Sequence, residues 1–359
     1  MKNAYLCIYM DDFSHDPSDS IVILRASCSP KRIDLLVRGY KLSQILRTAL
    51  EIGQFTLLKN PRTYEEIDIK LGTAPKLTKI PLDALVSLGL VGKNGELYES
   101  LDEAKEFLGV DSQFYQGHFI KLELSKYNLW NCLPQVLQKK EEDNQRTKPT
   151  DKFDSLHTIA MAKVAMRRSL SLVVETLLEV VLGFKTAKSM FDLDGGHGLY
   201  SIALTQAAPK LSSYVLDLPQ VIELAKEFIK TYKAESRINT IVGDITHDEL
   251  GNEAYDIIFA SHVLYHDICN KVIVNKIAIA FNYNIVFIIN QWMKKEKSDL
   301  SSVLWDIDLV LQGNSESALL TLDEFKLLLK ESTLYIENII EKGNSSAVTT
   351  IIVERNLLD

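Results

Sequence analysis

The N-terminal third of the chain places apolar and polar residues with the period of a helix. Apolar residues recur every three or four positions from Ile33 to about Leu58, which predicts a long amphipathic helix. Thr63 then precedes a shorter helical stretch and has Glu66 three positions later, which is the spacing of a capping box. Gly72 follows the last apolar position and is expected to end this second helix.

A third helix and a hairpin complete this region. Residues 80–90 again carry apolar side chains at helical spacing, and residues 91–100 form two short runs around Asn94-Gly95. Because Asn-Gly favours a type I′ turn, we expect a β-hairpin centred on these two residues. Three helices followed by a hairpin are typical of a winged helix.

The third helix indicates what this winged helix does. A helix that reads DNA presents Arg, Lys, Asn or Gln, but this one offers only apolar candidates, namely Leu82, Leu85, Val86 and Leu88. We therefore interpret residues 31–150 as a packing and dimerisation domain, and a DNA-binding regulator is the disfavoured alternative. The charged, proline-containing stretch at 139–152 is expected to be a linker, and residues 1–30 receive no role.

The pattern changes near Ser189, after two amphipathic helical stretches at about 153–169 and 170–183. From there, short apolar runs alternate with helical stretches, which is typical of βαβ units and a parallel sheet. Thr321 and Glu324 have the spacing of a second capping box, and two runs near the C-terminus predict a closing antiparallel hairpin. The fold class predicted for residues 151–359 is therefore a doubly wound, Rossmann-like α/β sheet.

Composition narrows the classes of partner. Among 359 residues, 40 are Lys or Arg and 48 are Asp or Glu, and the formal net charge of −8 argues against a nucleic-acid partner. The longest apolar runs fall short of the roughly 18 residues that a membrane span needs, so we expect no membrane partner. The cysteines are widely separated, which predicts free thiols and a cytoplasmic location; they are Cys7, Cys28, Cys132 and Cys269.

The candidate chemistry lies just after the predicted strands, where ligands bind in such sheets. The first strand ends in DLDGGHG, which holds Asp192 and a glycine loop made of Gly195, Gly196 and Gly198. Asp217 ends the second strand, and an acid there accepts ribose hydroxyls. Clustered acids would repel a pyrophosphate but suit a cationic ligand, so we predict S-adenosylmethionine rather than a dinucleotide. The further residues expected to line its site are Leu218, Asp244, Ile245 and Ser261.

These motifs resemble those of the class I S-adenosylmethionine-dependent O-methyltransferases that act on small molecules in plants and bacteria. The family's DVGGGxG matches DLDGGHG, its DLPxV matches residues 217–221, and its GD matches Gly243-Asp244. The resemblance covers about residues 33–359 and implies an N-terminal winged-helix dimerisation domain. It also implies that Met161 lies near the cofactor and that Asp306 matches an aspartate of the family's late helix. Asp194 replaces the family's first loop glycine.

The catalytic positions depart from this family. The family's VLHDW carries a histidine base, but here Tyr265 stands at that position and His266 follows it. The two glutamates that orient the family's base fall on Asn290 and near Leu319. His266 or His262 is expected to serve as base with Tyr265 lining the pocket, unless these side chains only pack or cap a helix.

The resemblance implies metal-independent methylation of a small aromatic or polyketide-like hydroxyl compound by a homodimer. The altered catalytic positions leave open a cofactor-binding regulator that has lost transfer activity. Asn290 and Asp306 are expected to face the acceptor, together with aromatic residues of the inter-domain helices: Phe114, Tyr115, Phe119, Tyr127 and Trp130.

Overall fold

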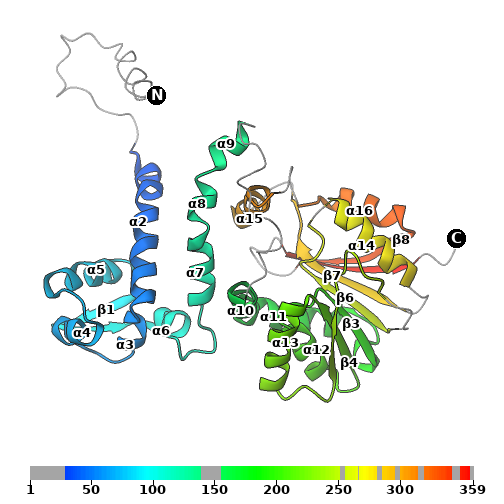
Figure 1. Ribbon diagram of the computed structural model, residues 1–359, viewed down its shortest axis with the longest axis horizontal. Coiled ribbons are helices and arrows are strands. Elements are labelled where there is room, and N and C mark those ends of the chain that lie inside the picture. The colour runs from blue at the N-terminus through cyan, green and yellow to red at the C-terminus, as the bar shows by residue number, and fades with distance from the viewer. Residues whose placement is uncertain are drawn as a thin grey trace, which may run out of the picture. The chain divides into compact units, whose positions relative to one another are not determined.

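A computed structural model describes residues 29–138, 155–250, 255–265, 267–280, 285–295, 300–313, 319–341 and 348–355 (Figure 1). The chain divides into two compact units, residues 1–46 and 47–359. Two predicted features, the linker at 139–152 and the candidate base His266, lie outside the described residues.

The first unit is described from residue 29 and contains most of helix α2 (Lys31–Glu51). The predicted helix is therefore present, but it ends at Glu51 rather than near Leu58, because Gly53 turns the chain with a φ of 74° before a separate short helix. The early turns of α2 bury little. Ile33, Leu35, Leu36 and Val37 are between 64% and 78% exposed. An apolar stretch of this kind is typical of a surface that pairs with another chain.

The winged-helix order is present in the second unit. Helix α4 begins after Thr63, whose side chain accepts a hydrogen bond from the Glu66 amide, and it ends at Gly72 in the left-handed conformation. Both predicted caps of this helix are confirmed. The helices are α3 (Gln54–Leu57), α4 (Tyr64–Leu71) and α5 (Pro75–Ser87), and the hairpin strands are β1 (Val91–Asn94) and β2 (Leu97–Ser100).

The hairpin turn lies one residue later than predicted. Asn94 pairs with Leu97, so the two turn residues are Gly95 and Glu96. Only Gly95 has a positive φ, of 60°, which fits a type II′ turn rather than type I′. The glycine thus occupies the first central position, where a positive φ is required.

Helix α5 begins at Pro75, earlier than the apolar pattern indicated, because Pro is well suited to the first turn. Leu82 and Leu85 are completely buried. This helix therefore uses its apolar residues in the core of the domain. Further helices follow: α6 (Asp102–Leu108), α7 (Gly117–Ser125), α8 (Tyr127–Trp130) and α9 (Leu133–Leu137).

The two helical stretches predicted before the sheet form one continuous path. Helix α10 (Ser155–Val164) passes into α11 (Leu170–Val180) through a π-helical turn at Ala165–Ser169. Apolar spacing does not reveal such a turn, because one extra residue per turn changes the helix face only locally.

A seven-stranded sheet follows, in the order β5-β4-β3-β6-β7-β9-β8 (Figure 1). The first five strands in that order are parallel, and β9 and β8 close the sheet as an antiparallel hairpin, as predicted. The strands are β3 (Ser189–Leu193), β4 (Ser212–Asp217), β5 (Ile238–Val242), β6 (Ile257–Ser261), β7 (Val286–Trp292), β8 (Leu334–Ile340) and β9 (Val348–Arg355).

Helices cover both faces of the sheet (Figure 1). Side chains of α14 (Asp267–Ala280) and α16 (Leu322–Glu331) build the core on one face. Side chains of α10 and α11, of α12 (Leu199–Ala207) and of α13 (Pro219–Thr231) build the core on the other. The capping box of Thr321 and Glu324 begins α16 as predicted, and α15 (Leu300–Leu311) precedes it.

Candidate functional site

The strand order reverses between β3 and β6, which lie side by side at the centre of the sheet. Ligands bind outside the carboxyl ends of the strands at such a point. Asp194 and His262, which follow these two strands, have positive φ angles of 52° and 62°. Non-glycine residues rarely adopt this conformation, and backbone strain of this kind gathers at functional sites.

The loop after β3 needs its glycines for different reasons. A Cβ on Gly195 would lie 2.7 Å from Val215 Cγ1 and 2.9 Å from Asp192 Cγ, so this glycine lets the loop pack against the sheet. Gly196 has a φ of 58°, and a Cβ there would meet nothing within 4 Å. Gly198, with a φ of 70°, begins helix α12. The backbone near Gly196 is thus both tightly turned and open on one side.

Asp217 connects the end of β4 to this loop. Its carboxylate accepts a hydrogen bond from the Gly196 amide at 2.7 Å and another from the Leu218 amide at 2.7 Å. The side chain is only 4% exposed. Two backbone donors therefore fix the carboxylate at the end of its strand, beside the glycine loop.

Asp192 is placed differently from the other acids. It is 1% exposed and accepts a 2.6 Å hydrogen bond from the Ser201 hydroxyl, which in turn contacts the Ser213 hydroxyl. Burial raises the pKa of Asp192 to about 7. Its carboxyl group lies against Gly195, so it packs directly beneath the backbone of the glycine loop at the end of β3.

Asp194 lies beside Asp217 and forms a side-chain hydrogen bond with it. Burial and the neighbouring charge of Asp217 raise the pKa of Asp194 to about 8. Two carboxyl groups in hydrogen-bond contact hold one proton between them, because two adjacent carboxylates repel each other.

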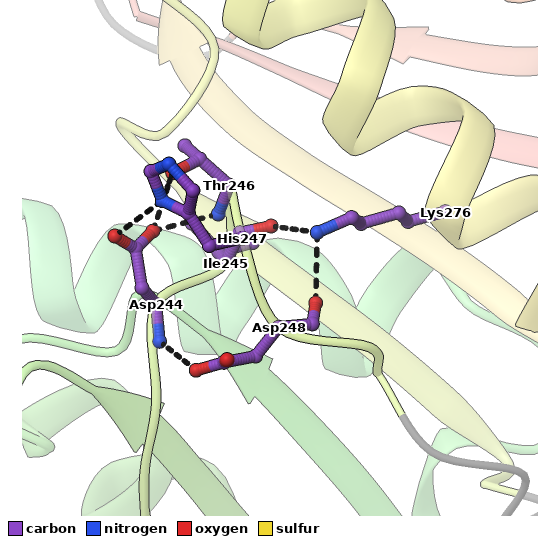
Figure 2. A network of polar contacts seen from close by, with 6 residues as sticks. All are labelled: Asp244, Ile245, Thr246, His247, Asp248 and Lys276. Carbon is purple, nitrogen blue, oxygen red and sulfur yellow. Dashed lines mark hydrogen bonds and ion pairs between the residues drawn. The ribbon is translucent and has the colours of Figure 1, made fainter.

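A second acidic turn follows β5 (Figure 2). The Asp244 carboxylate accepts hydrogen bonds from the Thr246 amide at 2.8 Å and the Thr246 hydroxyl, and it contacts His247 Nδ1 at 2.9 Å. Burial raises the pKa of Asp244, but the hydrogen bonds from Thr246 and His247 outweigh burial and hold it below its usual value. Lys276 donates to the carbonyl of Ile245, a residue that belongs to the core. Asp244 therefore stays ionised, and the hydrogen bond from Lys276 fixes the turn that carries it.

His262 and Tyr265 form a pair after β6. The Tyr265 hydroxyl lies 2.6 Å from His262 Nδ1 and accepts a hydrogen bond from the Trp292 amide at 3.1 Å. Burial lowers the pKa of His262 to about 4 and raises that of Tyr265 well above its ordinary value. The Tyr265 hydroxyl donates its proton to His262 Nδ1. We therefore assign His262 the neutral tautomer that carries its proton on Nε2. Neither side chain then offers a basic atom near neutral pH.

Asn290 occupies the position of an orienting glutamate but acts as a structural amide. It is 1% exposed, donates to the Ser261 hydroxyl at 3.0 Å and accepts from the Thr350 hydroxyl at 3.3 Å. Leu319, near the second such position, packs with Tyr265 in a small apolar cluster. The positions of the family's two orienting glutamates thus hold a satisfied amide and, nearby, an apolar side chain.

The polar contact between α8, with Lys126 just before it, and α15 was not predicted from the sequence. The Asp308 carboxylate accepts a hydrogen bond from Lys126 Nζ at 2.8 Å and another from Trp130 Nε1 at 2.7 Å. The Lys126 ammonium also lies 5.9 Å from the centre of the Trp305 ring. Trp305 packs edge-on against Tyr265, and among the residues that the structure describes its buried Nε1 has no hydrogen-bond partner. The aspartate of α15 that contacts Trp130 is therefore Asp308.

Asp306 faces a neighbouring hollow of about 250 Å³ between α9 and α15. Its walls are mainly apolar, with Lys294 and Asp306 as charged members; they include Leu133, Val136, Val303, Ile307 and Leu319. The Leu319 amide donates to the Asp306 carboxylate at 3.3 Å.

The remaining acceptor candidates lie on α7, in the turn before it and at the start of α8. Tyr115 is buried against Gly117, Phe119 is partly buried, and Tyr127 is 52% exposed. Gln116 donates to the Lys163 carbonyl at 2.9 Å and so ties α7 to α10, which carries the partly buried Met161. The structure therefore separates these residues into buried and open positions.

Two further findings hold for the described ranges alone. Within them, none of the helices has the length and apolar character needed to cross a membrane. Over the same ranges, no group of three or more His, Cys, Asp or Glu side chains is arranged to hold a metal ion.

Two family models match the chain. The O-methyltransferase domain matches residues 150–333, more than half of the chain, and the O-methyltransferase dimerisation domain matches residues 35–109. The chain belongs to the O-methyltransferase family. The family and the fold predicted from the sequence are thus confirmed, and S-adenosylmethionine is the cofactor of that family.

Relatives of this O-methyltransferase-family chain include an uncharacterised protein of Methanocaldococcus jannaschii, 31% identical over 242 residues. That alignment spans 65% of this chain but only 64% of the relative's length. The tetracenomycin polyketide synthesis 8-O-methyl transferase TcmO of Streptomyces glaucescens is 26% identical over 66% of this chain and 70% of its own. The crystal structure of human N-acetylserotonin methyltransferase in complex with SAM has the same fold, with a TM-score of 0.73 and 18% identity. It covers 95% of this chain and 99% of the human chain.

Proposed function

We propose that the protein transfers the methyl group of S-adenosylmethionine to a hydroxyl of a small aromatic or polyketide-like acceptor, without a metal. The observation that carries the proposal is the glycine loop fixed against Asp217 at the switch point of a family-matched sheet. This is the position where such sheets take a nucleoside ligand.

The residues at this edge fit the cofactor in shape and charge. Gly196 leaves open space where a side chain would otherwise stand, and the acids suit a ligand with cationic groups. Asp217 is the acceptor for the ribose hydroxyls, with Asp244 towards the adenine and Asp192 supporting the methionine end through the loop. The other proposed members of the site are Gly195, Gly198, Leu218, Ile245, Ser261 and Met161.

The bound cofactor supplies an already activated methyl group, so the residues of this chain have to align the acceptor and manage one proton. Trp130, Phe119 and Asp306 are proposed to surround the acceptor. The sequence also predicts Asn290 there, but its amide is buried and satisfied within the sheet, so we propose only a supporting role for it. TcmO is named as an 8-O-methyl transferase of tetracenomycin polyketide synthesis, and this supports a polyketide-like acceptor. His266 remains the proposed base, since His262 is committed to Tyr265.

We further propose that the protein works as a homodimer joined through its N-terminal domain. The matched dimerisation domain supports this assembly, as do the exposed apolar residues on α2. Light scattering at micromolar concentration should give twice the chain mass of 40.6 kDa, and a monomer mass would contradict it.

The decisive experiment has two arms on the full-length protein. Calorimetry with S-adenosylmethionine and S-adenosylhomocysteine should show binding of both without added metal. Incubation with labelled S-adenosylmethionine and a panel of phenols, enols and polyketides should then give a methylated product by mass spectrometry. Absence of binding would overturn the cofactor assignment.

A second candidate function is a cofactor-binding regulator without transfer activity. It is favoured by one observation, that Tyr265 and Asn290 stand as satisfied structural groups where the family has catalytic ones. Binding without product across the whole panel would favour it. If an acceptor is found, His266→Ala should lower turnover by about 10²–10⁴-fold, and His262→Ala should lower it much less.

A further inference from the structure

Asp194 stands where the family resemblance places a glycine, and it adopts a positive φ of 52°. Glycine adopts that conformation freely, whereas aspartate reaches it at some cost. The exchange also introduces a carboxyl group into the cofactor loop, in side-chain contact with Asp217. This chain therefore has one more acidic group at the proposed ribose position than the family motif supplies.

The charged groups that act on Asp194 are all acidic. They are Asp192 on β3, Asp217 at the end of β4 and Asp244 after β5. The imidazoles of His197, in the same loop, and of His262, after β6, are neutral at physiological pH, because burial lowers the pKa of each to about 4. Burial together with these carboxylates raises the pKa of Asp194 to about 8. The pair of Asp194 and Asp217 thus keeps a proton in the pH range where the protein is expected to work.

We propose that Asp194 makes the cofactor site prefer the cationic donor S-adenosylmethionine over its neutral-sulfur product S-adenosylhomocysteine. The inference rests on the proposed function, but it assigns to Asp194 a specificity role that binding alone does not require. A cation near a protonated carboxyl pair favours release of the proton, since an opposite charge favours the ionised form. The product has lost the sulfonium charge and gains nothing from that release.

Proton balance gives the proposal a direct signature. When the donor binds, the pair of Asp194 and Asp217 would give its proton to the buffer and carry two negative charges, which the positive charge of the ligand favours. When the product binds, the proton stays on the pair. Donor affinity should therefore rise relative to product affinity as the pH passes through the titration of the pair.

The test is calorimetry on the full-length protein with each ligand separately, between pH 6 and 9. Two buffers with different ionisation enthalpies report the number of protons released. Asp194→Asn keeps the shape and tolerates the positive φ but cannot ionise, and Asp194→Gly restores the residue of the family motif. Asp323→Asn, which removes one acid that is 92% exposed on α16, is the matched control for net charge.

In the wild type, the ratio of product to donor dissociation constants should grow about tenfold or more across this range, because charges this close shift a pKa by about one unit or more. Donor binding should release more protons than product binding. In both Asp194 variants the ratio should change less with pH than in the wild type, with the part that Asp192 contributes remaining, and in the control it should follow the wild type.

A pH-independent ratio in the wild type, or an unchanged profile in both folded Asp194 variants, would overturn the role of Asp194 while leaving the proposed function intact. No binding of either ligand by the wild type would instead remove the proposed function, and the inference with it. If Asp194→Asn fails to fold, Asp194→Gly still decides the question, because glycine relieves the backbone strain at this position.

Discussion

The loops after β3 and β4 and the region around Tyr265 lie at the same end of the sheet but are built in different ways. On the cofactor side, backbone amides fix a carboxylate, as Gly196 and Leu218 do for Asp217. On the acceptor side, side chains fix one another, as Tyr265 does with His262 and Lys126 with Asp308. The first arrangement follows a family motif, and the second replaces one.

This difference reflects what each side has to recognise. A loop that holds a fixed cofactor depends on backbone geometry, which glycines and one acid encode in a short motif. A pocket for a varied acceptor depends on side chains from several helices, which a family exchanges as its substrates change. The comparison predicts that substitutions on the cofactor side affect binding, whereas those on the acceptor side affect stability and turnover.

The largest expected effect is that of Asp217→Ala on the cofactor side. The substitution removes the acceptor proposed for two ribose hydroxyls and leaves the amides of Gly196 and Leu218 without their partner. Losing two charge-assisted hydrogen bonds of about 1.5 kcal/mol each weakens binding by about 100-fold or more. Calorimetry with S-adenosylmethionine measures this, and Asp323→Ala is the control. Unchanged affinity would show that the ribose lies elsewhere.

On the acceptor side, Lys126→Met should destabilise the fold. The side chains of Lys126 and Asp308 are only 14% and 7% exposed, so the substitution leaves a mostly buried carboxylate without its cation. Breaking such a pair costs about 3 kcal/mol. Denaturant unfolding should show this loss of stability. Cofactor affinity should change little when it is measured under conditions in which both proteins are folded.

The double variant Lys126→Met with Asp308→Leu sharpens this prediction. Removing both charges avoids the unpaired carboxylate, so the double variant should be more stable than Lys126→Met alone. If the single variant unfolds at the same denaturant concentration as the wild type, the ion pair contributes nothing to the acceptor side.

The sequence predicted features whose cause is local. The capping boxes that begin at Thr63 and Thr321 follow from residues three positions apart, and the strand that ends at Asp217 follows from a short apolar run. The alternation of strands and helices was enough to predict a parallel sheet closed by a hairpin.

Features that join distant residues were not accessible to the same reasoning. Lys126 and Asp308 are 182 positions apart, and apolar spacing on α15 gave no reason to prefer Asp308 over Asp306. Likewise, the exchange of glycine for Asp194 was visible, but its contact with Asp217 depends on how two strands are paired. Pairing of this kind is set by the whole sheet rather than by a motif.

Tyr265→Phe tests whether the acceptor side works through the Tyr265 hydroxyl. The substitution leaves His262 Nδ1 and the Trp292 amide without a partner, which should cost about 1–3 kcal/mol of stability. Turnover should fall less than tenfold, because the hydroxyl is buried and already donates its proton to His262. Comparing turnover at saturating substrate with the wild type checks this. A loss as large as that expected for His266→Ala would make Tyr265 part of the chemistry.

The smallest expected effect is a difference in sign between the two sides when the ligand-free protein is titrated. Burial lowers the pKa of His262 to about 4, below the value of about 6.5 in the unfolded chain, so the unfolded chain binds more protons between these values. Stability contributed by His262 is therefore complete above pH 6.5 and is lost as the pH falls towards 4.

The pKa of Asp194 is raised to about 8, so its contribution is present at low pH and is lost as the pH rises towards 8. Denaturant unfolding between pH 4 and 9 should show that His262→Asn removes a gain in stability as the pH rises from 4 to 6.5. Asp194→Asn should remove a loss in stability that extends from about pH 4 to 8. Each slope is at most about 1.4 kcal/mol per pH unit, because a single group exchanges one proton. Both substitutions suit a positive φ, so equal slopes in wild type and variants would mean that neither group titrates differently in the folded protein.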